Sequence, residues 1–252
     1  MIILKLFSMQ SLVLSILATS AFAQPQVAKF SSAPPIIDGI IDDTAWQAAP
    51  WYPIDKHILG DMPKPDDFSG RYKVTWDENQ LYILAEITDD ILIDQHADPR
   101  HNYWDDDTLE IFIDEDMSGG DHQYSYNAFA YHVALDGQAA DFGPKNQDGS
   151  NNIVLLNNHL NSVWKRAPNA PNKVIWEVAL SIYDDTFKQD TNSHPVHLSA
   201  GKKMGFMLAY CDNDGSKYRE HFIGSHNIEP VNGDKNRGYI DASVFGTLKL
   251  IK

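Results

Sequence analysis

The chain has 252 residues, of which 43% are hydrophobic, and a formal net charge of −15 at pH 7. This acidic balance argues against nucleic acid and anionic membranes as partners, because binding to both depends on Lys and Arg side chains that neutralise phosphates. The only cysteine is Cys211, which excludes an internal disulfide and the CxxC motifs of zinc and redox sites. The composition suits a protein that binds neutral ligands or divalent cations.

The first 23 residues predict an export signal. Lys5 supplies a weak positive charge, residues 12–18 (LVLSILA) are apolar, and residues 21–23 (AFA) match a signal-peptide cleavage site. The apolar run is shorter than the roughly 20 residues of a membrane-spanning helix. An uncleaved anchor is the alternative. We expect residues 24–252 to form a single domain without a membrane span, exported to the periplasm or the extracellular space.

Alternating hydrophobicity predicts strands along most of the chain. Residues 71–76 (RYKVTW) and 81–87 (LYILAEI) flank a polar turn and indicate a hairpin. In the next strand, residues 109, 111 and 113 face the core, and residues 110, 112 and 114 face the other way. We expect further strands at Tyr124–Leu135, Val174–Ile182, Lys203–Cys211, Tyr218–Ile223 and Phe245–Ile251.

The fold class predicted by these strands is all-β, an antiparallel β-sandwich. Turn residues separate the strands at Asp136-Gly137, 213–215 and Asn232-Gly233. Helical pattern is confined to two candidate short turns, at 43–46 and 181–187. The Pro- and Asn-rich segment 167–173 predicts a long surface loop.

The segment 101–116 (HNYWDDDTLEIFIDED) is the most acidic stretch near aromatic residues, and catalysis is one explanation for it. A glycosidase needs two carboxylates about 5–5.5 Å or 6.5–9.5 Å apart. Asp107 and Glu110 point to opposite faces of a regular strand, whereas Glu110 and Asp114 share a face but lie roughly 13 Å apart. No two acids within this strand make such a pair, although a partner on a neighbouring strand stays open.

Calcium is a second explanation for the acids. Asp89 and Asp90 end one predicted strand, and residues 105–107 precede the next. If those strands are neighbours, the loop between them brings both acidic groups to its base, where hard oxygen ligands can hold Ca²⁺. We take Asp90 and Asp107 as the first candidates. A solvated acidic loop is the alternative, and a second, weaker cluster comprises Asp114, Asp116 and Asp121.

Trp104 and Tyr239 lie in polar loops, where an exposed aromatic face suits a sugar ring. The apolar face of a pyranose stacks on the aromatic ring while polar side chains bind its hydroxyls. The alternative for Trp104 is that it folds back onto the core. The remaining Trp residues in periodic or capped segments are expected in the core: Trp46, Trp76, Trp164 and Trp176.

Ten histidines leave haem as another ligand to consider. His132 lies within a predicted strand, where a structural role is the simpler interpretation. Haem ligation of the His/Met type needs only two residues that lie far apart in sequence, so His122 and the methionines keep it open.

Four segments together resemble carbohydrate-binding module family 9. They are residues 37–46 (IDGIIDDTAW), residues 74–85, the pattern Trp104-x-x-Asp107-x-x-Glu110 with the strand that follows it, and residues 245–250 (FGTLKL). The similarity spans nearly the whole mature chain in the same order. It implies a DOMON-like β-sandwich that binds sugars, commonly at the reducing ends of glucans and xylans, with structural calcium.

The resemblance also implies roles for single residues. Trp104 matches the first aromatic ring of the sugar clamp, Glu110 a hydroxyl-binding acid, and Asn236 an amide contact. Tyr239 stands where the second ring is usually Trp. The calcium acids fall near Asp90 and Asp107.

One expected cation has no clear match. The family carries an arginine on the strand after the acidic segment, and Asn127 is the best alignment here. Its loss would remove a strong bidentate donor.

The sequence therefore predicts an exported, non-catalytic protein that binds a mono- or oligosaccharide, with calcium as a structural ion. A haem-binding DOMON-like electron-transfer protein and a polysaccharide-active glycoside hydrolase are the alternatives. The sugar and the oligomeric state are left open.

Overall fold

The computed structural model describes residues 25–189 and 191–252, so the expected export signal lies outside the described residues. These residues form fourteen strands and three single 3-10 turns. The bounds of the strands are β1 (Gln26–Phe30), β2 (Tyr52–Ile54), β3 (Lys56–Gly60), β4 (Phe68–Trp76), β5 (Leu81–Asp89), β6 (Thr108–Asp114), β7 (Phe129–Ala134), β8 (Ala139–Gly143), β9 (Asn152–Leu155), β10 (Leu160–Ala167), β11 (Ala170–Leu180), β12 (Lys203–Asp212), β13 (His221–Gly224) and β14 (Gly246–Ile251). The turns are η1 (Thr44–Trp46), η2 (Tyr103–Asp105) and η3 (Ala242–Val244).

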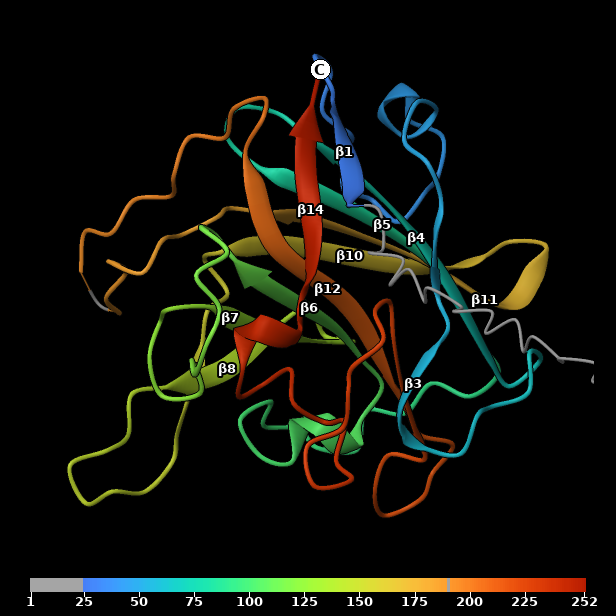
Figure 1. Ribbon diagram of the computed structural model, residues 1–252. Helices are drawn as coiled ribbons and strands as arrows, with labels where there is room; N and C mark the ends of the chain where they lie inside the picture. The colour runs from blue at the N-terminus through green and yellow to red at the C-terminus, as the bar shows by residue number, and fades with distance from the viewer. Residues whose placement is uncertain (1–24, 190) are drawn as a thin grey trace, which may run out of the picture.

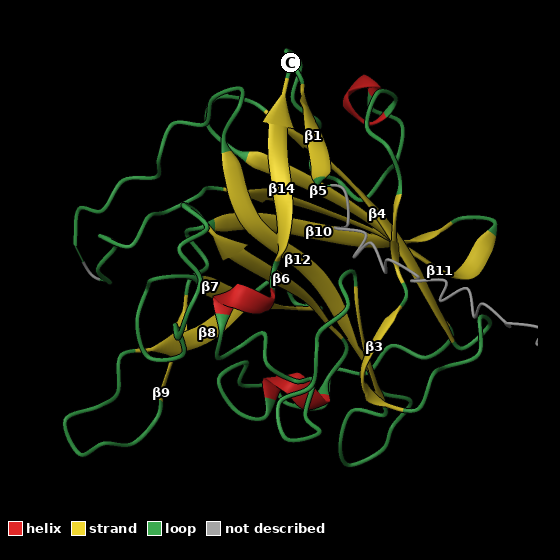
Figure 2. Cartoon of the chain, in the orientation of Figure 1, coloured by secondary structure: helices red, strands yellow, loops and turns green. Residues whose placement is uncertain are grey.

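All strands belong to one mixed sheet that folds over into a sandwich (Figure 1). Its order is β10-β11-β5-β4-β1-β14-β12-β6-β7-β8-β9, with β2, β3 and β13 paired at the side. We call β10-β11-β5-β4 the first layer and β12-β6-β7-β8-β9 the second. Strands β1 and β14 join the two layers (Figure 2). The all-β sandwich is confirmed, but it is mixed because β1 pairs in parallel with both β14 and β4.

The main core lies between the two layers. Alternation places Leu109, Ile111 and Ile113 of β6 in it, as predicted. Aromatic rings meet across the layers as well, with Phe68 stacked on Tyr210 at 5.3 Å between ring centroids. Each such apolar side chain, when fully buried, stabilises the fold by about 1.5–3 kcal/mol, so the layers hold together through this interior.

The opposite face of β6 is buried too. Phe112 packs there with Met207, Ala209 and Phe222 in a second apolar cluster, and every residue of β6 is buried. The cover comes from β3, β13 and the loops around η2 and η3. A strand that alternates in sequence is therefore enclosed on both faces, and this encloses Glu110.

Several predicted elements are confirmed and others are wrong. The hairpin exists, with Trp76 opposite Leu81. The strand predicted from residue 124 starts only at Phe129, because residues 121–128 form turns. The segment 167–173 is not a long loop: residues 168–169 form a tight turn between β10 and β11, and the rest of the segment belongs to these two strands. Residues 181–187 contain no helical turn.

Three of the four tryptophans expected in the interior are buried, namely Trp46, Trp76 and Trp176. Trp164 is half-buried and packs against the main core. Trp46 belongs to a third cluster on the outer face of the first layer, with Tyr82 and Leu84 of β5. Both layers therefore carry apolar groups on their outer faces.

Candidate functional site

A cavity of about 330 Å³ lies on the outer face of the second layer. Its walls come from η2, from β6, β7 and β8, and from the loops that follow β12 and precede η3. Four of the five predicted sugar-binding residues line it: Trp104, Glu110, Asn236 and Tyr239. The others are Tyr103, Gln123, His132, Phe142, Asn151 and Arg219.

The η2 turn holds Trp104 at the cavity wall. Asn102, in the left-handed region at φ 50°, leads into the turn. The buried ring of Tyr103 packs edge-on against both Trp104 (5.0 Å between centroids) and His132 (4.4 Å). Trp104 itself is half-buried and belongs to none of the core clusters of the described residues. Its indole is thus anchored on one side and faces the cavity on the other.

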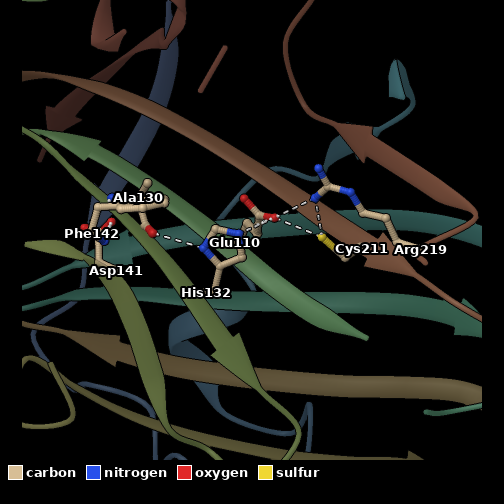
Figure 3. Close-up of polar contacts among 7 residues, drawn as sticks. All are labelled: Glu110, Ala130, His132, Asp141, Phe142, Cys211 and Arg219. Carbon is tan, nitrogen blue, oxygen red and sulfur yellow. Dashed lines mark hydrogen bonds and ion pairs between the residues drawn. The ribbon is translucent and has the colours of Figure 1, made fainter. Parts of the chain in front are cut away.

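The floor of the cavity is a buried carboxylate with three partners, drawn in Figure 3. Glu110 Oε1 lies 2.7 Å from His132 Nε2, 3.4 Å from Arg219 Nη1 and 2.9 Å from the Cys211 thiol that donates to it. Burial raises the pKa of Glu110, but His132 and then Arg219 outweigh it and hold the pKa below its usual range. Glu110 is therefore an ionised acceptor.

Arg219 is a cation beside Glu110 that the sequence analysis did not select. Only 8% of its side chain is exposed. Its Nη1 donates to Cys211 Sγ at 3.0 Å, and its guanidinium lies 4.3 Å from the centre of the Phe222 ring. The backbone N–H of Arg219 donates to Asp105 in η2. It comes from the loop between β12 and β13, a position that no local spacing relates to Glu110.

The far wall is the loop that carries Asn236 and Tyr239. Gly238 lies so close to β6 that a Cβ there would stand 2.7 Å from the Phe112 ring, so this approach requires glycine. His122 fixes the same loop through two contacts. Its ring Nε2 lies 2.8 Å from the Gly238 carbonyl oxygen, and its backbone N–H donates to the carbonyl oxygen of Ile240. Tyr239 then stacks on Phe142, at 6.0 Å and 30° between planes.

Asn127 does not join these residues. It is absent from the cavity lining, and its Nδ2 donates to the Gly119 carbonyl oxygen at 3.2 Å. The alignment placed it on a strand, but β7 begins only at Phe129. The β7 residue paired with Glu110 is His132. A histidine and an arginine from another loop therefore stand around the carboxylate where one arginine was expected.

The two predicted calcium ligands fall in two adjacent groups of acids. Asp107 lies with Asp89 and Asp212, and Asp90 with Asp67 and Asp214; within each group the carboxylate oxygens lie within 4.8 Å of one another. Strands β5 and β6 are not neighbours, because they belong to opposite layers. The acids therefore meet at one end of the sandwich rather than along a shared sheet edge.

The buried group has the character of a cation site. Asp89, Asp107 and Asp212 are all at most 2% exposed, and Asp89 Oδ1 has no hydrogen-bond partner among the described residues. Burial, followed by mutual repulsion, raises the pKa of Asp107 to about 9 and that of Asp212 to about 8. Three neighbouring buried carboxylates are costly to ionise without a counterion. Their hard oxygen atoms fit Ca²⁺.

The other candidate acids make local contacts. Asp114, Asp116 and Asp121 accept hydrogen bonds from the backbone N–H groups of Gly119, Ser118 and Gln123 respectively. Hydrogen bonds of this kind, from a backbone N–H to a nearby Asp carboxylate, stabilise local turns.

The cavity does not present a pair of carboxylates. Among the described residues that line it, Glu110 is the only acid, whereas glycoside hydrolysis needs two. Glu110 is also committed to His132, Cys211 and Arg219. The arrangement recognises a polar ligand.

A β-sandwich with an aromatic-walled cavity over a charged, hydrogen-bonding floor defines a carbohydrate-binding domain of the non-catalytic kind. Residues 37–252 match the family model described as "Carbohydrate family 9 binding domain-like". The chain belongs to this family, which confirms the resemblance seen in the sequence.

Solved structures share the fold. A carbohydrate-binding module of family 9 from Caldicellulosiruptor kristjanssonii, in complex with cellotriose, aligns with a TM-score of 0.64 and 20% identity, over 90% of this chain and 94% of that one. A putative carbohydrate-binding protein from Bacteroides uniformis aligns with a TM-score of 0.55 and 13% identity, over 90% and 100%.

Curated relatives are larger proteins. Exoglucanase XynX of Acetivibrio thermocellus is 25% identical over 198 residues, and endo-1,4-beta-xylanase A of Thermotoga neapolitana is 36% identical over 81 residues. The matches cover 77% and 32% of this chain but only 16% and 7% of those proteins. Separately, the described residues contain no helix with the length and apolarity needed to cross a membrane.

Proposed function

We propose that the cavity on the second layer binds a mono- or oligosaccharide derived from glucan or xylan. One observation carries this proposal: aromatic walls, Trp104 and Tyr239, enclose a floor made of an ionised carboxylate with its cation. A sugar ring presents an apolar C–H face and a rim of hydroxyl groups, and the cavity offers a partner for each.

The polar residues divide into acceptors and donors. Glu110 accepts hydrogen bonds from hydroxyl groups. The hydrogen bonds of the Arg219 side chain to Glu110 and Cys211 use its Nη1, so its other guanidinium nitrogens can donate to the ligand. Gln123, Asn151 and Asn236 add amides around the rim. Since Glu110 and Arg219 cancel in charge, the cavity suits a neutral sugar rather than an ion.

The compared proteins support this ligand class. The family 9 module of C. kristjanssonii was solved with cellotriose and also with glucose, and the curated relatives are named as xylanases and an exoglucanase. Family membership also favours saccharide over haem. His132, one of the histidines weighed for haem, is engaged with Glu110.

We also propose a structural calcium ion, held by Asp89, Asp107 and Asp212, with Asp90 in the adjoining group. The ion would neutralise carboxylates that are buried together. Its place has a bearing on the cavity: Asp107 Oδ1 accepts from the N–H of Asn213, the loop residue after Asp212, and this loop leads to Arg219. Calcium would therefore stabilise the frame of both Trp104 and Arg219.

Export is part of the proposal. It rests on residues 12–18 and 21–23, whose pattern is that of a signal peptide. Detection of the mature protein outside the cytoplasm, with an N-terminus near Gln24, would support it; an intact N-terminus on cytoplasmic protein would contradict it.

The binding experiment is calorimetric titration of glucose, cellobiose, cellotriose and xylobiose into the calcium-loaded protein. We expect saturable 1:1 binding of at least one of them, lost in Trp104→Ala. Trp164→Phe is the matched control, since Trp164 is a half-buried indole outside the cavity. Absence of binding by a folded protein, together with a Soret absorption band, would replace this function with the haem alternative.

A further inference from the structure

A second cavity, of about 320 Å³, lies on the outer face of the first layer, on the other side of the sandwich. It is open to solvent and is built on β4, β5 and the segment around η1. The residues that matter for its chemistry are Asp42, Gln47, Trp51, Arg71, Lys73 and Glu86.

Trp51 is the platform of this cavity. The Arg71 guanidinium carbon lies 4.1 Å and Lys73 Nζ 4.8 Å from the centre of its ring. Arg71 and Lys73 alternate along β4 on its outer face, whereas Tyr72 and Val74 point into the core. Both cations therefore approach the indole from the sheet. Two cation–π contacts hold the ring in place, and its remaining surface borders the cavity because Trp51 is only half-buried.

The rim of the cavity offers donors and acceptors with balanced charge. Glu86 is paired with Arg71 at 2.8 Å and with Lys173 at 2.9 Å. Lys73 Nζ donates to the Trp46 carbonyl oxygen at 2.6 Å. The rest of the lining comes from the segment around η1: Ile41, Asp42, Asp43, Trp46 and Gln47. A ring of mixed donors and acceptors with nearly no net charge suits a neutral polyhydroxyl ligand better than an ion.

The wall opposite β4 is fixed before any ligand arrives. Glu177, fully buried in β11, the strand beside β5, accepts hydrogen bonds from Trp46 Nε1 at 2.8 Å and from the backbone N–H groups of Asp38 and Gly39 at 3.0 and 2.9 Å. These bonds tie the segment before η1, and η1 itself, to the sheet. Because this wall is already ordered, ligand binding loses little further conformational entropy.

We propose that this cavity is a second saccharide-binding site, in which a neutral sugar ring stacks on Trp51. Because this cavity is the more open of the two, it fits an internal unit of a β-glucan or xylan chain, whereas the less open cavity of the second layer fits a single ring or a chain end. The domain then has two sites on opposite outer faces and can contact two saccharide chains at once.

The test uses Trp104→Ala, which removes the first site, and the probes cellohexaose and xylohexaose. Two-dimensional NMR of the tryptophan indole N–H groups follows each titration, with the Trp51 signal assigned by its disappearance in Trp51→Phe. We expect the Trp51 signal to shift and saturate with at least one probe. In Trp104→Ala/Trp51→Ala we expect affinity to fall about tenfold or more, as for the loss of an aromatic stack.

Two results would overturn the second site. One is an unmoved Trp51 signal with both hexasaccharides; the other is equal affinity in Trp104→Ala and the double variant. Neither result bears on the first site, because that site is tested separately by comparing the single variant Trp104→Ala with the unchanged chain. Trp51→Phe guards against misfolding, because it keeps a ring over Arg71 and should bind more weakly than Trp51 but more strongly than Trp51→Ala.

Discussion

The two outer faces of the sandwich place the same kinds of side chain in opposite settings. On the second layer, Glu110 pairs with His132 and Arg219 at 2%, 6% and 8% side-chain exposure. On the first layer, Glu86 pairs with Arg71 and Lys173 at 15%, 48% and 35%. The difference is the cover: η2 and the loops around β13 and η3 lie over the second layer, whereas among the described residues the segment around η1 flanks the cavity of the first layer.

This contrast shows that burial, rather than residue type, sets what a charged cluster does. An enclosed ion pair is screened little and is costly to break, while an exposed one exchanges readily with water. The enclosed face therefore has the more rigid polar site, and the open face the more permissive one. Four experiments test how far the contrast holds.

The largest effect is expected from removing one charge on each face. Glu110→Gln leaves Arg219 buried without its anion and should lower the free energy of unfolding by about 3–5 kcal/mol. The matched variant Glu86→Gln, on the open face, should cost about 1 kcal/mol or less. Urea denaturation of both variants measures this. Equal losses would show that the two faces do not differ in the way their exposure indicates.

Calcium removal should act more strongly on the enclosed face. With calcium at one hundred times its dissociation constant, binding stabilises the fold by about 2.7 kcal/mol. A chelator should therefore lower Tm, and it should also weaken sugar binding in the Trp104 cavity while leaving the Trp51 cavity unchanged. Asp107→Asn should remove most of the response to calcium. An identical Tm with and without the chelator would contradict the ion.

Stability should also depend on pH through Asp141, next to the enclosed site. Burial raises its pKa to about 7, against the backbone N–H groups of Ala130 and Phe142, which lower it. In the unfolded chain the value is near 3.8. Between pH 3.8 and about 7 the Asp141 carboxyl is protonated in the folded state but ionised in the unfolded chain. Its contribution to the free energy of unfolding is therefore present at low pH and is lost as pH rises towards about 7.

The slope from this single group is at most about 1.4 kcal/mol per pH unit. Asp141→Asn should remove that part of the slope when urea unfolding is compared between pH 5 and pH 7. A slope that persists in Asp141→Asn would assign it to other groups.

The smallest effect is expected from exchanging the type of cation. Arg219→Lys keeps the charge near Glu110 but loses the planar, multiple donors, so affinity in the Trp104 cavity should fall about fivefold, close to 1 kcal/mol. Arg71→Lys, its counterpart on the open face, should not alter binding of glucose or cellobiose in that cavity. Calorimetry with both variants decides this, and unchanged affinity in Arg219→Lys would remove Arg219 from the ligand contacts.

Much of the fold follows from local pattern. In the β4–β5 hairpin and in β6, hydrophobicity alternates with a period of two residues, and this pattern can be read from neighbouring residues alone. Strands β1, β2, β3, β8, β9 and β10 were missed. Their burial does not alternate cleanly; β10, for example, is exposed or half-buried throughout. The positions of β1 and β3 are in addition decided by partners distant in sequence, namely β14 and β4 for β1, and β13 for β3.

The site divides in the same way. Trp104 and Tyr239 were selected as aromatic residues in polar loops, and Glu110 and Asn236 from the resemblance to the family; all four line one cavity. Arg219 was missed because its link to Glu110 spans 109 residues and depends on how β12 lies beside β6. Asn127 was misplaced since the turns of 121–128 shorten the strand on which the alignment relied.

The parallel pairing of β1 with β14 has a mechanical consequence. Gln26 lies opposite Leu248 and Lys29 opposite Ile251, and the two strands run side by side in the same direction (Figure 1). A force that pulls β1 at its first residue and β14 at its last must slide one strand along the other. All the hydrogen bonds between them then carry the load at once, instead of opening one after another as in a hairpin pulled apart at its ends. The pair that joins the layers therefore resists a pull along the strands more strongly than a hairpin of the same length that is opened from its ends.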